Sequence, residues 1–290
     1  MTTNSAATST NGLPLAAPEG ERRYSAQSIS VIIPTRLAAV NPDHPAPPRF
    51  IDRAIASVRR QTVWAHSLRM RIVVAVDPGR SAEARLCLPA DVVVVEGDRM
   101  SQSSALNAAL GAVDGDVVAI LEDDDLWHPE YLDTSMRLLE EAAFVSSTQL
   151  AVWPDGAIAN VFDFPTPSGW VMRRETLLRV GRFNEDFRWH LDNEWLGRLA
   201  ASRLPRVHLV EATAPIHRQL VEECRPILDQ VVRHGGPSSR LYRHRLPWPM
   251  VQRTLHPNSG MAQIMRDPAK RADSRREHDR LIAQYGHLPH

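Results

Sequence analysis

From residue 29 onwards, short apolar runs alternate with helix-like stretches, and this alternation limits the possible folds more than any other property of the sequence. The apolar runs are continuous and rich in valine and isoleucine, which predicts strands at residues 29–33, 72–76, 92–95 and 117–121. Helices are expected between them at residues 50–61 and 103–113. Continuous apolar strands separated by helices are typical of a parallel sheet covered on both faces. The sequence therefore predicts an α/β fold with a mostly parallel sheet flanked by helices, whose ligands bind beyond the carboxyl ends of the strands.

Composition divides the chain into three segments. Residues 1–27 are rich in Ser, Thr, Ala and Asn with few large apolar side chains, so we expect a disordered leader. Residues 28–218 carry the alternating pattern and are expected to form one domain. Further helices are expected there at residues 129–142, 174–180 and 192–201, and further strands at residues 144–152, 157–162 and 207–210. Residues 219–290 are rich in Arg, His and Pro, and we expect a helical, Arg-rich C-terminal extension.

Opposite charges are segregated along the chain, although 34 basic residues balance 34 acidic ones. This balance argues against a general polyanion-binding protein, and no nucleic-acid-binding motif occurs, so we expect no nucleic-acid partner. Residues 114–125 contain six acids and no base, which indicates a cation site, whereas residues 233–280 contain eleven bases and four acids. The basic segment is consistent with contacts to diphosphate oxygens, to an anionic membrane surface or to a second subunit of a homodimer, or with a solvated helix face.

The bulk properties favour a cytoplasmic protein. No run approaches the roughly 20 apolar residues of a membrane-spanning helix, and the N-terminus lacks the basic-then-apolar order of a signal peptide. The two cysteines, Cys87 and Cys224, have no metal-ligand spacing, so we expect free thiols rather than a disulfide or a zinc site.

Four consecutive acids, Glu122, Asp123, Asp124 and Asp125, directly follow the strand expected at residues 117–121. Like charges at this spacing repel one another unless a cation or a proton neutralises them. Mg2+ and Mn2+ prefer carboxylate oxygens and leave coordination positions open for phosphate oxygens. This acidic block therefore predicts a divalent-cation site; the alternative is a solvated turn in which Asp125 caps the following helix.

The motifs around the acidic block resemble, in content and order, those of family 2 of the GT-A glycosyltransferases. The matching stretches are Pro34-Thr35-Arg36, Asp77-Pro78-Gly79, Ser104-Ala105-Leu106-Asn107 before Gly115-Asp116, the acidic block itself, Val180-Gly181-Arg182-Phe183-Asn184-Glu185-Asp186, and Leu191-Asp192-Asn193-Glu194-Trp195 with Arg198. The resemblance spans about residues 28–218. It implies a GT-A fold and an enzyme that moves a sugar from a nucleoside-diphosphate donor to an acceptor hydroxyl with inversion of the anomeric configuration.

The resemblance also implies roles for single residues. It implies that a UDP- or GDP-sugar is bound by Pro34, Thr35, Arg36, Asp77, Asn107, Glu122, Asp123, Ser168 and Gly169. The stretch after the second strand, Asp-Pro-Gly-Arg, departs from the family's Asp-Asp-Gly-Ser and leaves the base preference open. The implied metal, Mn2+ or Mg2+, is expected on Asp124, with His217 as a further ligand or as a structural histidine. A Lewis-acid metal there helps the diphosphate to leave.

The general base implied by the resemblance is Asp192, because the family's Glu-Asp pair appears here as Leu191-Asp192. A carboxylate within hydrogen-bond reach can take the proton of the acceptor hydroxyl as it attacks. Two other interpretations remain: Asp192 could cap a helix, and His190, whose ordinary pKa lies nearer neutrality, could be the base.

Two other functions compete with glycosyl transfer. A sugar nucleotidyltransferase would need a Gly-rich basic loop after the first strand, where this chain has Arg36 and a proline-rich loop at residues 37–49. That loop is itself either a candidate lid or an ordinary insertion. A catalytically silent nucleotide-sugar-binding protein is suggested by the departures from the family pattern at Glu122 and Leu191.

Overall fold

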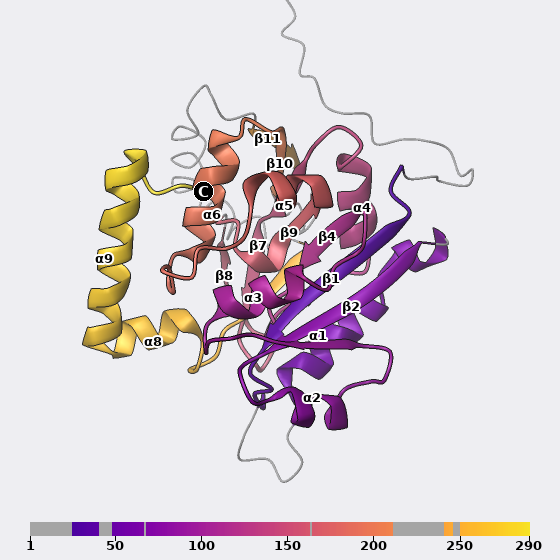
Figure 1. Cartoon of the computed structure of the whole chain (residues 1–290), viewed down its shortest axis with the longest axis horizontal. Helices are drawn as coiled ribbons and strands as arrows, with labels where there is room; N and C mark the ends of the chain where they lie inside the picture. Colours follow the sequence, from indigo (N-terminus) through magenta and orange to yellow (C-terminus); the bar gives the residue numbers. More distant parts are fainter. Residues whose placement is uncertain (1–24, 41–47, 67, 163, 211–240, 246–249) are drawn as a thin grey trace, which may run out of the picture.

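The computed structural model of the chain describes residues 25–40, 48–66, 68–162, 164–210, 241–245 and 250–290. An eight-stranded sheet has the order β11-β10-β6-β9-β4-β1-β2-β3, and a four-stranded sheet has the order β5-β12-β7-β8. Helices lie on both faces of the larger sheet (Figure 1). Most of its strand pairs are parallel, so the predicted α/β fold with a mostly parallel sheet flanked by helices is confirmed.

The strands of the larger sheet are β1 (Ser28–Thr35), β2 (Arg69–Val76), β3 (Val93–Glu96), β4 (Val117–Ile120), β6 (Phe144–Ser147), β9 (Trp170–Arg173), β10 (Arg206–Val210) and β11 (Leu241–Arg245). Those of the smaller sheet are β5 (Leu126–Trp127), β7 (Gln149–Val152), β8 (Ile158–Phe162) and β12 (Val251–Thr254). The helices are α1 (Phe50–Arg59), α2 (Ser81–Cys87), α3 (Gln102–Leu110), α4 (Tyr131–Leu138), α5 (Arg174–Val180), α6 (Leu191–Ala201), α8 (Gly260–Arg266) and α9 (Pro268–Tyr285). Two short 3-10 turns, η1 and η2, cover Thr62–His66 and Pro167–Gly169.

Alternate residues of the central strand β1 face opposite sides of the larger sheet. Val31 and Ile33 join a buried core with α1 and α4, whereas Ile32 joins a second core with α3, α5 and α6. β1 is buried along its whole length and pairs in parallel with β2 and β4. Its continuous apolar sequence is therefore the signature of a strand with both faces covered, and the carboxyl ends of β1, β2 and β4 meet at one edge of the sheet.

Residues 144–152, expected as one strand, form two strands in different sheets. β6 pairs with β9 and β10 in the larger sheet, and after Thr148 the chain continues as β7 in the smaller sheet. A local apolar run carries no signal for this change, because sheet membership depends on partners far along the chain. β9, which the strand pattern did not predict, lies antiparallel between β4 and β6.

The C-terminal extension is built into the domain and is not wholly helical. β11 pairs in parallel with β10, and β12 lies between β5 and β7 of the smaller sheet. At the other end, Gln27, expected in the leader, donates a backbone hydrogen bond to Oδ2 of Asp116 (2.8 Å). The expected boundary at residue 218 and residues 1–24 of the expected leader lie outside the described residues.

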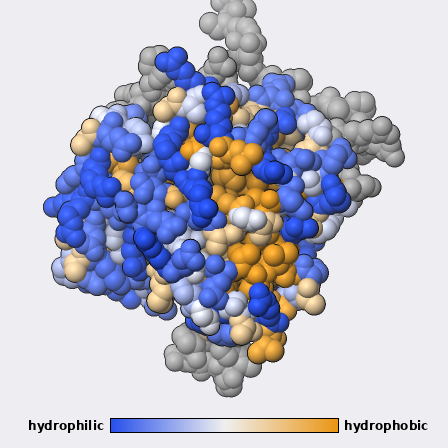
Figure 2. All heavy atoms as spheres, in the orientation of Figure 1, coloured by the Kyte–Doolittle hydropathy of each residue, from blue (hydrophilic) through white to orange (hydrophobic). Residues whose placement is uncertain are grey.

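The long helix α9 runs along one side of the domain next to α6 (Figure 1). Only Glu277 and Leu281 are buried among its residues, and Figure 2 shows a largely hydrophilic surface on this side of the molecule. In the part of the chain that the structure describes, no helix has the length and apolar character needed to cross a membrane.

Candidate active site

The acidic block lies at the carboxyl end of β4, where the chain passes from the larger sheet to β5 of the smaller one. Glu122 accepts a hydrogen bond at Oε1 from Nε2 of Gln102, the first residue of α3 (2.7 Å), and at Oε2 from Oγ of Ser168 (3.2 Å). Asp125 is buried and accepts from the backbone amide of Thr254 on β12 (2.9 Å). Elements from three parts of the sequence therefore fix the direction of these carboxylates.

Thr35, the last residue of β1, joins the same cluster. Its Oγ1 donates to Oδ2 of Asp123 (2.5 Å) and accepts from the amide of Leu37 (2.8 Å). Leu37 adopts a left-handed conformation with φ of +58°, which turns the chain sharply after the strand. The structure thus brings together two of the predicted donor-binding residues, Thr35 and Asp123.

His256 contacts the acidic block, although the sequence patterns did not predict it. Its Nε2 lies 2.8 Å from Oδ2 of Asp124, which is 132 positions earlier in the chain. The imidazole also packs on the ring of Phe50 with 4.6 Å between the ring centroids. His217, the histidine expected at the metal, lies outside the described residues. The signal that could have indicated His256 is its place just after a short strand, β12.

Burial and mutual repulsion disfavour the ionised form of the carboxyl groups in the acidic block. Burial, and next the charge of Asp124, raise the pKa of Glu122 to about 7 and that of Asp123 to about 7. The same two causes raise the pKa of Asp125 well above its ordinary value. The positive charge of Arg253 on β12 opposes the shift at Glu122 and Asp125. A bound cation would offset this repulsion more strongly than a single arginine.

The donor atoms around Asp124 suit a divalent cation that also binds phosphate. Asp124, whose side chain is 24% exposed, offers carboxylate oxygens, and His256 offers an imidazole nitrogen of the kind that transition metals bind. Among the described residues, no group of three or more His, Cys, Asp or Glu side chains is arranged to hold a metal by itself. An ion held by one or two side chains and by substrate phosphates needs no such cage.

The other residues expected at the nucleotide differ in exposure. Pro34 is buried within β1, and Arg36 is exposed directly after it. Asp77 follows β2 and is 9% exposed, in a turn where Gly79 has a φ of +78°. Because β2 is the parallel neighbour of β1, Asp77 lies at the same edge of the sheet as Thr35.

Ser168 and Gly169 are buried and support the acidic block from η2. The hydroxyl of Ser168 accepts from the amide of Glu122 (3.0 Å), and its carbonyl accepts from Nε1 of Trp127 (2.6 Å). The carbonyl of Gly169 accepts from the hydroxyl of Tyr131 (2.7 Å). Ser168 thus lies next to Glu122, whereas Gly169 contacts Tyr131; the contact of either residue with a donor sugar stays a prediction.

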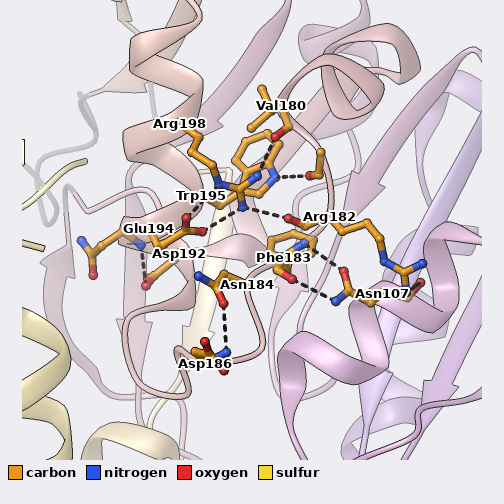
Figure 3. Close-up of polar contacts among 12 residues, drawn as sticks. Asn107, Val180, Arg182, Phe183, Asn184, Asp186, Asp192, Glu194, Trp195 and Arg198 are labelled. Atoms are coloured by element: carbon orange, nitrogen blue, oxygen red, sulfur yellow. Dashed lines mark hydrogen bonds and ion pairs between the residues drawn. The ribbon is translucent and has the colours of Figure 1, made fainter. Parts of the chain in front are cut away.

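Asn107 holds the segment that follows α5 against α3 (Figure 3). Its Nδ2 donates to the carbonyl of Phe183 (3.0 Å) and to Oε1 of Glu185 (2.9 Å), and its Oδ1 accepts from the amide of Phe183 (2.9 Å). Asn107 is 4% exposed, so these contacts give it a structural role. Its expected contact with the nucleotide sugar stays a prediction.

Side chains of α6 fix the end of α5 in the same region (Figure 3). Gly181 ends α5 with a φ of +90°, and its carbonyl accepts from Nε1 of Trp195 (3.0 Å). Arg198 donates to the carbonyls of Val180 (2.5 Å) and Arg182 (2.8 Å). The segment that leads into α6 is therefore anchored where it begins.

Asp192 lies in the first turn of α6 and is partly exposed. Its Oδ1 accepts from the amide of Asn193 (2.9 Å). Burial raises the pKa of Asp192, and the positive charge of Arg253 acts against this shift. The charge of Asp192 in turn contributes to the raised pKa of Glu122, so Asp192 lies within electrostatic range of the acidic block.

His190, the alternative base, has both ring nitrogens engaged. Nδ1 lies 2.9 Å from Oδ1 of Asn193, and Nε2 lies 3.0 Å from Oγ of Ser274 on α9. Nδ2 of Asn193 donates to the carbonyl of Pro289 (2.7 Å), which fixes Oδ1 as the atom facing His190. An amide oxygen only accepts, so Nδ1 carries a proton, and in the neutral imidazole Nε2 accepts from the hydroxyl of Ser274. The lone pair that a general base needs is thus already used.

Solved structures that are similar to this chain at low sequence identity include the following three. The mannosyltransferase PcManGT from Pyrobaculum calidifontis, in complex with GDP-Man and Mn2+, is 18% identical with a TM-score of 0.48, and the match covers 72% of this chain and 65% of that chain. S. aureus TarS is 13% identical with a TM-score of 0.49, and the match covers 89% of this chain and 42% of that chain. TarS 1-349 in complex with UDP is 13% identical with a TM-score of 0.47, and the match covers 89% of this chain and 70% of that chain. The chain spans less than two thirds of the length of the first two structures.

Comparisons at the level of sequence give the family. None of the curated proteins matches the chain. The model of glycosyl transferase family 2 matches residues 30–189, which is more than half of the chain and contains the acidic block. The family expected from the order of the motifs is thus confirmed, and the chain belongs to glycosyl transferase family 2.

Proposed function

We propose that this protein transfers a sugar from a UDP- or GDP-sugar to an acceptor hydroxyl with inversion, and that a divalent cation, Mn2+ or Mg2+, binds at Asp124 and His256. The observation that supports the proposal best is the contact between Asp124 and His256 beside three carboxylates that are costly to charge. That excess of negative charge suits a cation with open positions for a diphosphate.

The residues of the chain have separate tasks in the proposed reaction. Asp124 and His256 hold the cation, which when bound offsets the negative charge of the departing diphosphate. Thr35 and Ser168 hold Asp123 and Glu122 in place through hydrogen bonds, so these carboxylates are oriented before the donor arrives.

Asp192 acts on the acceptor. Its Oδ1 is engaged by the amide of Asn193, which leaves Oδ2 to accept the proton of the acceptor hydroxyl. The hydroxyl oxygen forms its bond to the anomeric carbon as the bond to the diphosphate breaks, and the proton passes to Asp192. Attack from the face opposite the diphosphate inverts the anomeric configuration. His190 is disfavoured as the base because Nε2 already accepts a hydrogen bond and Nδ1 is protonated.

The donor half of the proposal is tested by calorimetry with UDP, GDP, CDP and dTDP, each with and without Mn2+. We expect one nucleotide to bind at least tenfold more tightly with Mn2+, and Asp124→Ala and His256→Ala to remove this gain. Asp91→Asn is the matched control, because Asp91 is 71% exposed and pairs only at the surface with Arg59. Equal binding with and without Mn2+ would contradict the metal site.

The transfer half is tested by incubating the selected donor with hydroxyl acceptors and following release of the nucleoside diphosphate. Release of pyrophosphate from a nucleoside triphosphate and a sugar phosphate would instead support the sugar nucleotidyltransferase. Tight, metal-dependent binding of nucleotide sugars with neither transfer nor hydrolysis of any donor would support the catalytically silent binding protein.

A further inference from the structure

The C-terminal helix α9 holds the turn that leads into α6 through one carboxylate. Oε1 of Glu277 accepts from the amide of Arg188 (2.9 Å), and Oε2 accepts from the amides of Trp189 (2.8 Å) and His190 (3.0 Å). Three successive N–H groups that converge on one point form a concave anion-binding site. Glu277 is 8% exposed, so its charge is buried in that site and depends on these bonds.

Other contacts from the C-terminal end reach the same turn. Ser274 meets Nε2 of His190 (3.0 Å), and the carbonyl of Pro289 accepts from Nδ2 of Asn193 (2.7 Å). The guanidinium of Arg280 lies 4.4 Å from the centroid of the Phe187 ring. Residues on both sides of Glu277 thus touch the segment between residues 187 and 193.

The turn needs this external support because α6 begins without a side-chain cap of its own. Its N-cap is His190, with φ −126° and ψ 33°, and the side chain of this N-cap residue accepts no hydrogen bond from the first amides of the helix. A Ser, Thr, Asp or Asn at the N-cap usually fixes the start of a helix by accepting from the second or third helical amide. Glu277, 87 positions further along the chain, instead fixes the N-cap residue itself by accepting from the amide of His190.

The position of Asp192 gives the contact its functional meaning. Asp192 is two residues beyond the last amide that Glu277 binds, and it projects from the first turn of the same helix. We infer that Glu277 is a positioning residue, which fixes the start of α6 so that the carboxylate of Asp192 stays aimed at the acceptor hydroxyl. This inference rests on the proposed function, and it makes α9 part of the catalytic apparatus without any contact to substrate.

Releasing the turn is expected to lower the rate of the reaction. A displacement of about 1 Å at a reacting group can lower the rate about 100-fold. The donor binds at the acidic block, which Glu277 does not contact, so affinity for the nucleotide and the cation is expected to stay within about twofold of the wild type. A purely structural role would lower the folded fraction and so reduce every activity alike.

The test compares Glu277→Gln with Asp279→Asn in the full-length protein. Both remove one negative charge from α9, but Asp279 is 71% exposed and pairs with neighbouring His278. We expect Glu277→Gln to lower kcat about 10- to 100-fold with unchanged KM for the donor, and hydrogen exchange at the amides of Arg188, Trp189 and His190 to become faster. Asp279→Asn keeps the wild-type kcat and the wild-type exchange.

Loss of folded protein lowers kcat but does not change the pH at which kcat falls. The pH profile of kcat therefore distinguishes a positioning role of Glu277 from a purely structural one. The titratable groups that act on Asp192 are His190, Arg253 and Glu122, and burial raises its pKa. When the turn loosens, the carboxylate becomes more exposed to water and its pKa falls towards the ordinary range. The acid limb of kcat is therefore expected to move to lower pH in Glu277→Gln.

Two results would overturn the inference: wild-type kcat in Glu277→Gln, or a loss of kcat with an unmoved acid limb and an unchanged amide exchange. Should Glu277→Gln fail to fold, Ser274→Ala carries the test, because it removes a contact to the same turn and leaves Glu277 in place. If the wild-type protein transfers no sugar, the proposed function is contradicted. If the wild-type protein is active and Glu277→Gln has the same kcat, only the inference about Glu277 is contradicted.

Discussion

Carboxylates serve two opposite purposes in this protein, and the difference lies in their hydrogen-bond donors. Asp116 accepts from the amide of Gln27 and from the hydroxyl of Ser28, and these bonds lower its pKa. Asp116 therefore stays ionised and ties the start of β1 to the start of β4. Glu122 and Asp123 receive too few donors to offset burial, so their pKa values rise. A buried carboxylate with so few hydrogen-bond donors is suited to bind a cation.

We predict that Asp192→Asn lowers kcat by about 10²- to 10⁴-fold, the usual contribution of a general base. Asn keeps the oxygen that accepts from the amide of Asn193, so the geometry of α6 is retained while the proton acceptor is lost. Steady-state kinetics and calorimetry of the nucleotide check both parts, with Asp91→Asn as the control. A variant with wild-type kcat would exclude Asp192 as the base.

The pH dependence of kcat follows from the raised pKa of Asp192. Only the ionised carboxylate accepts a proton, so kcat falls as the pH drops through the pKa of Asp192. Because burial raises that pKa, the acid limb is expected above the ordinary aspartate value of about 3.9. The profile is measured for the wild type and for His190→Gln. If the limb disappears in His190→Gln, the histidine and not Asp192 is the base.

At the scale of helices and strands, local sequence patterns predicted the elements that have the same surroundings along their whole length. β1, β2 and β4 were predicted because both of their faces are buried, and the end of α5 was indicated by Gly181, whose φ of +90° favours glycine. β9, β12 and the division of residues 144–152 were missed, because each depends on a partner far along the chain. His256 was missed for the same reason, since β12 carries it to the acidic block.

The packing of α9 on α6 leads to a prediction about Gly197. A Cβ at Gly197 would lie 2.5 Å from the ring of Tyr285 on α9, so Gly197→Ala forces the two helices to adjust. We expect a loss of about 1–2 kcal/mol in the free energy of unfolding, measured with urea. In the Tyr285→Ala background the same change is expected to stabilise by up to about 1 kcal/mol, because alanine favours helix over glycine. Equal effects in both backgrounds would contradict this packing.

At the scale of the whole molecule, the two sheets meet at the acidic block. β4 belongs to the larger sheet, β5 and β12 belong to the smaller one, and the four carboxylates lie in the connection between β4 and β5. The block is therefore held by the larger sheet, through Thr35 of β1, and by the smaller sheet, through the amide of Thr254. A cation bound at the proposed site would hold the folded arrangement of both sheets at once.

Divalent cation is accordingly expected to raise the melting temperature. With Mn2+ and the matching nucleoside diphosphate at about 100 times the dissociation constant, the stabilisation is about 2.7 kcal/mol, which corresponds to an increase of about 5 °C or more. Differential scanning calorimetry with Mn2+ and then with EDTA measures the gain and its reversal. An equal increase in Asp124→Ala would show that the ion acts elsewhere.

The distance of 132 residues between Asp124 and His256 also has a consequence for biosynthesis. A ribosome makes chains from the N-terminus, so the acidic block emerges long before the histidine that faces it. During that interval β5 and β7 lack β12, the strand that lies between them in the finished smaller sheet. The proposed site, which needs both Asp124 and His256, can therefore form only in a chain that has been translated at least as far as His256.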